Sequence, residues 1–192
     1  MTRRVATALA AVAGIAGCAT VFGGARSLEP TRLTNEPGWI VAGPTPELRQ
    51  RNVRECGATS LAMVAGRWHV PFSVAEAVAA LPAPTAQGTR LGDLLDLARA
   101  NGLRAFAVEG DRDTLVHELR AGRPVIVGLR LQDGPGRTQS RYGVIVAVHP
   151  SDGQFVMLDP GSGLRVRSWV DLDAEWLPAG RPTLVVLGAT PT

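Results

Sequence analysis

A change of hydrophobic period at Pro124 is the sequence feature that most constrains the fold. Before this proline, apolar residues recur at helical spacing. After it, they gather in short runs bounded by turn residues, which is typical of strands. We expect strands within residues 125–127, 144–146, 155–158 and 184–187. Helices followed by sequential strands predict an α+β fold with an antiparallel sheet, not a doubly wound α/β fold.

Four helices are expected before that change. The stretch 56–66 is rich in Ala and Leu and predicts a buried helix packed closely on its neighbours. Ser73 and Glu76 form a capping box for a second helix that runs to about Leu81. The third helix has its apolar face on Leu91, Leu94, Leu95 and Ala98 and is closed by Asn101-Gly102. The fourth helix has its apolar face on Leu115, Val116 and Leu119, is capped by Asp113 and ends at Gly122.

The N-terminus is typical of an export signal. Arg3 and Arg4 precede an apolar stretch from Val5 to Ala16, which is shorter than the roughly 20 residues of a spanning helix. Ile15-Ala16-Gly17-Cys18 resembles the lipobox of bacterial lipoproteins, which implies a signal peptide over residues 1–18 and a lipid on Cys18. Ala19 after the cysteine implies an outer-membrane anchor facing the periplasm. An ordinary signal peptide with an incidental cysteine is the alternative.

Residues 19–45 are dense in glycine and proline and predict a tether that ends in a docking segment. Within this segment, Trp39-Ile40-Val41 is expected to pack on the domain that follows, over residues 46–190.

Charge and composition exclude several classes of function. The 20 basic residues exceed the 17 acidic ones by three, and removal of Arg3 and Arg4 leaves an excess of one. No basic stripe remains to bind nucleic acid. The sequence carries no Walker-type loop and no set of His and Cys at metal-ligand spacing, so neither a cofactor nor a metal is expected.

One thiol stands out once Cys18 is set aside. Cys56 then has no disulfide partner, and an unpaired cysteine in an exported protein is either a buried small hydrophobe or a reactive thiol. Cys56 lies in the first turn of the predicted helix. Because the helix dipole stabilises a thiolate there, we expect a lowered thiol pKa.

Gln50, Cys56-Gly57 and Ser60 to Val64 together resemble the start of the bacteriocin-processing (double-glycine leader) cysteine peptidases. The resemblance continues through Gly122 to Val127, Tyr142, Asp159-Pro160 and Trp176, across roughly residues 46–190. It implies a papain-like fold with N-terminal helices packed on an antiparallel sheet. It also implies a peptide or protein as the binding partner.

The resemblance assigns roles to individual residues. Cys56 is the nucleophile, Gln50 donates to the oxyanion, and Asp159 orients the catalytic imidazole. The family's histidine position is occupied by Arg141, which cannot act as a base near neutral pH because its pKa is above about 12.

None of the three histidines is expected to replace the missing imidazole. His69 follows the far end of the Cys56 helix, His117 lies opposite an apolar helix face, and His149 falls in a hairpin turn, where a solvated ring is expected. The hairpin folds Asp159 back beside Arg141, so we predict an Arg141–Asp159 ion pair. This cation is expected to favour the Cys56 thiolate.

These observations predict an envelope lipoprotein whose cysteine-peptidase site has lost its base and binds a peptide or protein. Two alternatives stay open. One is a working cysteine peptidase whose base comes from a partner or from a rearranged loop 131–141, and the other is a structural lipoprotein of the envelope. The oligomeric state is not predicted.

Overall fold

The computed structural model describes residues 26–27, 36–83, 85, 88–132 and 134–189. The predicted signal peptide 1–18, its Cys18, and residues 19–25 and 28–35 of the predicted tether lie outside the described residues. The helices are η1 Val53–Glu55, α2 Cys56–Arg67, α3 Val74–Ala80, α4 Leu91–Ala100, α5 Arg112–Arg120 and α6 Trp169–Trp176. The strands are β1 Arg26–Ser27, β2 Ile40–Val41, β3 Leu103–Glu109, β4 Val125–Gln132, β5 Thr138–His149, β6 Gln154–Asp159, β7 Gly163–Ser168 and β8 Pro182–Ala189.

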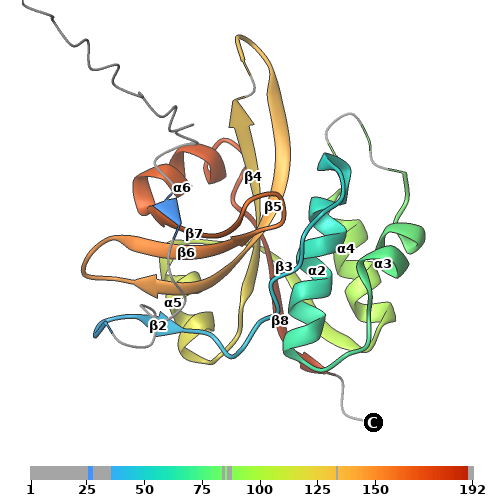
Figure 1. Ribbon diagram of the computed structural model, residues 1–192, viewed down its shortest axis with the longest axis horizontal. Helices are drawn as coiled ribbons and strands as arrows, with labels where there is room; N and C mark the ends of the chain where they lie inside the picture. Colours follow the sequence, from blue (N-terminus) through green and yellow to red (C-terminus); the bar gives the residue numbers. More distant parts are fainter. Residues whose placement is uncertain (1–25, 28–35, 84, 86–87, 133, 190–192) are drawn as a thin grey trace, which may run out of the picture.

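The strands form one antiparallel sheet in the order β1-β7-β6-β5-β4-β8-β3, with β2 paired to β5. Helices α2, α3 and α4 gather on one side of it, and α5 and α6 lie on the other (Figure 1). One core cluster contains residues of α2 and α4, and a second contains residues of α5 and α6. The predicted α+β fold, with N-terminal helices on an antiparallel sheet, is confirmed.

Helix α2 is buried along nearly its whole length, as its small and apolar residues predict. Its first ten residues, Cys56 to Ala65, are buried. The helix packs on β5, α3 and α4. Because a helix without a solvent-facing side cannot rotate freely against its neighbours, this packing fixes the direction in which Cys56 points.

Several elements and one cap differ from the sequence expectations. Strands β1, β3 and β7 and helices η1 and α6 were not expected. The cap of α5 is Asp111, whose side chain accepts the Thr114 N–H at 2.6 Å, so the expectation of Asp113 as the cap is wrong by two residues. Asp113 lies in the first turn instead, where its carboxylate still interacts favourably with the helix dipole.

The segment expected to dock on the domain lies in the sheet. Ile40 pairs with Val148 and Val41 pairs with Ala147, while Trp39 packs against the core cluster of α2. In the part of the chain that the structure describes, no helix is long and apolar enough to cross a membrane.

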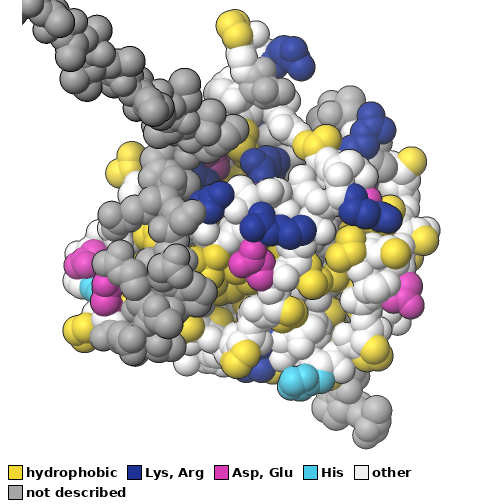
Figure 2. Space-filling view, in the orientation of Figure 1, with side chains coloured by type: hydrophobic (Ala, Val, Ile, Leu, Met, Phe, Trp, Pro, Cys, Tyr) yellow, Lys and Arg dark blue, Asp and Glu magenta, His cyan; other side chains and the backbone are white. Residues whose placement is uncertain are grey.

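Arginine side chains lie at several places on the face seen in Figure 2, with carboxylates beside some of them. Exposed pairs of this kind include Arg49–Glu47 and Arg90–Asp93. Such pairs contribute little to stability because water and salt screen them.

Candidate active site

Cys56 is the first residue of α2 and directly follows η1. Its side chain is 6% exposed. Gly57 lets the helix approach its neighbours, because a Cβ there would lie 3.3 Å from both Leu94 Cδ2 and Tyr142 Cδ2. Tyr142 in turn donates its hydroxyl hydrogen to Thr89 O at 2.9 Å. The Cys-Gly pair therefore places the thiol against β5.

The segment between Gln50 and Cys56 is closed by the buried carboxylate of Glu55. Glu55 accepts the Arg51 N–H at 2.8 Å, the Arg51 guanidinium at 3.0 Å and the Asn52 amide at 2.9 Å. The Arg51 N–H is the main cause of a Glu55 pKa below its ordinary value, and burial opposes it. We call residues 51–55 the Glu55 clip; it holds Gln50 at a fixed separation from the helix.

Replacing Glu55 with glutamine is expected to lower the free energy of unfolding at pH 7 by about 1.5–3 kcal/mol, the usual contribution of hydrogen bonds to a charged group. A carboxylate with a depressed folded-state pKa stabilises the fold above its unfolded pKa, and this contribution is lost as the pH falls through the folded pKa. Urea unfolding of wild type and variant should therefore differ at pH 7 and converge as the pH falls through the lowered folded-state pKa of Glu55. A difference that does not depend on pH would contradict the role of the charge.

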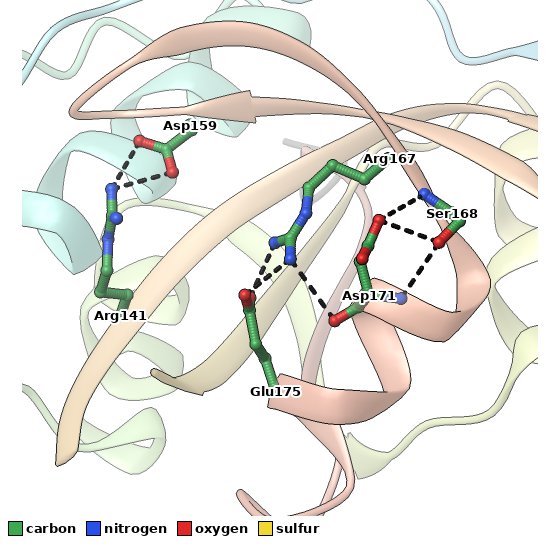
Figure 3. A network of polar contacts seen from close by, with 6 residues as sticks. All are labelled: Arg141, Asp159, Arg167, Ser168, Asp171 and Glu175. Atoms are coloured by element: carbon green, nitrogen blue, oxygen red, sulfur yellow. Dashed lines mark hydrogen bonds and ion pairs between the residues drawn. The ribbon is translucent and has the colours of Figure 1, made fainter. Parts of the chain in front are cut away.

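The predicted ion pair between Arg141 and Asp159 is confirmed. Arg141 Nη2 lies 2.6 Å from Asp159 Oδ1 and 2.8 Å from Oδ2. Figure 3 shows the guanidinium of β5 directed at the carboxylate at the end of β6, apart from the second network around Arg167. Asp159 Oδ1 also accepts the N–H groups of Gly161 and Ser162 at 2.7 and 2.9 Å. The carboxylate is thus held by the turn that follows it as well as by the guanidinium.

Gly161 marks the point where the predicted site residues meet. A Cβ at this position would lie 3.0 Å from Arg141 Nη2, 3.3 Å from Asp159 Oδ1 and 3.4 Å from Gln50 Nε2. The backbone of Gln50 is tied to the same turn, since its N–H donates to Pro160 O at 3.0 Å. The structure therefore brings Gln50, Arg141 and Asp159 together around a residue without a side chain.

The charges of Arg141 and Asp159 both act on the Cys56 thiol, but the pKa of this thiol is raised, not lowered. Burial is the largest cause and disfavours the thiolate. The Tyr142 N–H, the charge of Arg141 and the Gly57 N–H lower the pKa in part, and the charge of Asp159 raises it. The expectation that Arg141 favours the thiolate is correct in sign. The expectation of a lowered thiol pKa is wrong, because burial outweighs the helix terminus and the cation.

Alkylation of Cys56 by iodoacetamide is expected to show a pH inflection above that of an exposed cysteine. Replacing Arg141 with leucine should move the inflection higher, and replacing Asp159 with asparagine should move it lower. The rate is read on the Cys56 peptide by mass spectrometry, so that Cys18 does not interfere. A wild-type inflection below the ordinary cysteine value would contradict the dominance of burial.

The three histidines lie in other surroundings. His69 follows the C-terminal end of α2, and His117 is exposed on α5. His149 ends β5, eight residues from Arg141 and about 27 Å along an extended strand. Its ring is 9% exposed, its Nε2 lies 3.0 Å from Pro37 O, and Trp39 packs edge-on against it. The expectation of a solvated His149 is therefore wrong, because the docked segment 37–41 covers the ring.

Glu55 and Gly161 were not among the site residues expected from the sequence. A carboxylate directly before a buried helix, four residues after an arginine, was the available signal for Glu55. The Asp-Pro-Gly order after β6 was the signal for Gly161, since turns of this kind leave the acid free to accept the next N–H groups.

The model of the peptidase C39 family matches residues 45–179. A comparison with curated proteins gives no match. Among solved structures, a double-glycine-motif protease from an AMS/PCAT transporter, in complex with the leader peptide, is similar with a TM-score of 0.61. Its sequence identity to this chain is 18%, and the match covers 76% of this chain and 93% of the chain in that structure.

Two further structures agree in fold. The peptidase domain of Streptococcus ComA, a bi-functional ABC transporter of a quorum-sensing pathway, has a TM-score of 0.59 and 23% identity, with 75% of this chain and 97% of its own covered. A Bacillus anthracis protein described as a C39-like peptidase has a TM-score of 0.66 and 14% identity, with 80% and 99% covered. At these identities the neighbours establish the fold, and the family match carries the assignment. Because that match runs from before Gln50 to beyond Trp176 and the fold agrees with it, the chain belongs to the peptidase C39 family.

Proposed function

We propose that this protein is a lipid-anchored member of the family that binds an extended peptide around Gly161 and hydrolyses it poorly or not at all. The Arg141–Asp159 ion pair, whose two charges act on the Cys56 thiol, is the observation that carries the proposal. In a cysteine peptidase, a base must take the thiol proton and return it to the leaving amine. A guanidinium has no lone pair with which to take the proton, and with a pKa above about 12 it does not give one up at neutral pH.

The state of the thiol supports the same conclusion. Burial holds the Cys56 pKa above its ordinary value, so the thiol is protonated at neutral pH. Arg141 cannot remove this proton, and Asp159 accepts three other donors. The site therefore keeps the nucleophile Cys56 and the amide donor Gln50, but it lacks a group that can take and return the thiol proton.

A peptide ligand is supported by the family and by the neighbour solved with a leader peptide. Without a base, the groups around Gly161 still offer an amide N–H donor and a guanidinium to peptide carbonyls. The proposed envelope location rests on the lipobox resemblance at residues 15–18, with Cys18 as the acylated residue and residues 19–45 as the tether.

Binding of a synthetic leader peptide that ends in Gly-Gly tests the proposed ligand. Isothermal titration should give binding without hydrolysis, and Gly161→Leu should abolish binding because the new side chain crowds Gln50, Arg141 and Asp159. Gly92→Leu is the matched control, since no atom lies within 4 Å of a Cβ there. Equal binding by both variants, or no binding by the wild type, would overturn the proposed ligand.

The anchor is tested separately. The wild-type chain should partition with the membrane fraction and Cys18→Ala should not. Partition of both into the soluble fraction would overturn the lipoprotein assignment without bearing on the site around Gly161.

A further inference from the structure

Strand β3 is an open edge of the sheet. Within the described residues it pairs only with β8, at one end of the strand order, and the two-residue strand β1 forms the other end. Five of its seven residues are exposed. Phe106 and Val108, 47% and 39% exposed, lie on the same face of the strand. A long edge with exposed apolar residues is a ready template for another strand.

Two hydrogen bonds show which main-chain groups point outward. Gly110 N donates to Arg181 O at 3.0 Å. Since the main-chain groups of successive residues in an antiparallel strand point alternately to its two sides, those of Phe106 and Val108 bond to β8, and those of Ala107 and Glu109 face outward. Independently, Arg99 of α4 donates Nε–H to Ala105 O at 3.1 Å, which confirms that Ala105 faces outward as well. Because Arg99 occupies Ala105 O, we take the outward main-chain groups of Ala107 and Glu109, which bond to no other described residue, as the groups available for pairing.

This pattern is self-complementary in one register. When two β3 strands meet antiparallel about a twofold axis at Val108, Ala107 of one copy lies opposite Glu109 of the other. Each of the two such pairs exchanges both main-chain hydrogen bonds. Val108 then lies against Val108 of the second copy, and Ala105 O keeps its bond to Arg99.

The same register also places opposite charges of the two copies next to each other. Ala105 lies opposite Asp111 of the second copy, since both are three residues from Val108. Arg99 is held at Ala105 and is exposed, and Asp111 is exposed in extended conformation at the start of α5. Each copy therefore places a guanidinium beside a carboxylate of the other, at both ends of the pairing.

We propose that β3 is a homodimer interface, in which the sheets of two copies join edge to edge about Val108. The partner is a second copy of this chain, because the free main-chain groups, the apolar pair and the charges complement themselves in a single register.

Cysteine crosslinking tests the register directly. Val108→Cys places two thiols at a non-hydrogen-bonded pair, about 4.5 Å between Cα atoms, which a disulfide spans. Phe106→Cys is the matched control. It is as exposed, but its two copies are offset by four residues, about 14 Å. Under copper-phenanthroline oxidation, Val108→Cys should yield a covalent dimer, whereas Phe106→Cys and the wild type, which carries Cys18 and Cys56, should not. Equal crosslinking of the two variants would overturn the register.

A proline variant tests the interface without crosslinking. Ala107→Pro removes an outward N–H that β8 does not use, and proline is tolerated at such edge positions. Sedimentation equilibrium should show a concentration-dependent dimer for wild type and for Ala107→Val, and a monomer for a folded Ala107→Pro. A wild-type monomer at all concentrations, or a dimer that is unaffected by Ala107→Pro, would overturn the proposal.

Discussion

Arg141→His is expected to create Cys56-dependent cleavage of a double-glycine leader peptide. An imidazole at this position of β5 would have the carboxylate of Asp159 as a partner that fixes its tautomer, and it would stand where the charge of Arg141 already acts on the thiol. A positioned base contributes about 10²–10⁴-fold to the rate of such a reaction. The cleavage rate of the variant should therefore exceed that of the wild type by at least about 10²-fold.

Two controls separate proton transfer from loss of the guanidinium. Arg141→Gln removes the charge without supplying a base and should give no gain. Arg141→His combined with Cys56→Ala should be as inactive as Cys56→Ala alone. A folded Arg141→His variant that binds peptide but gains nothing would show that Gln50, Cys56 and Asp159 are not arranged for catalysis.

Asp159→Ala is expected to lower the free energy of unfolding by about 2–3 kcal/mol. It leaves the Arg141 guanidinium, whose side chain is only 20% exposed, without its counter-ion, and it deprives the Gly161 and Ser162 N–H groups of their acceptor. Breaking a fully buried pair costs about 3–5 kcal/mol, and the residual exposure of this one places it below that range.

Urea unfolding with two comparison variants checks this origin. Glu47→Ala breaks the exposed Arg49–Glu47 pair and should cost less than about 1 kcal/mol. Adding Arg141→Met to Asp159→Ala should recover part of the loss, because no unpaired charge then remains. A loss as small as that of Glu47→Ala would mean that the ion pair does not hold the turn.

Local patterns predicted the elements that build the site. The capping box at Ser73 and Glu76, the apolar face of residues 91–98 and the buried run after Cys56 each depend on neighbours within a few turns. The Arg141–Asp159 pair was predictable as well, because a hairpin with a short turn brings its two strand ends together.

The elements that were missed lack such a local signal. Strand β3 is exposed on most of its length, so its residues do not alternate between apolar and polar. Helix α6 is eight residues long, and only its Ser168–Asp171 capping box marked it. His149 is buried by a segment 112 residues away, and the thiol pKa is set by burial in the folded domain. Neither the burial of His149 nor the pKa of the Cys56 thiol can be predicted from the residues nearby in the sequence.

Cys56-dependent cleavage of the leader peptide by the native protein is the measurement that tests the proposed absence of a working base most directly. Wild type and Cys56→Ala are incubated with the leader peptide at neutral pH, and the two cleavage products are quantified by mass spectrometry. The two proteins should be indistinguishable, because the Cys56 thiol is buried and protonated and Arg141 cannot take its proton. Multiple turnovers by the wild type alone would contradict this and would require a base other than Arg141.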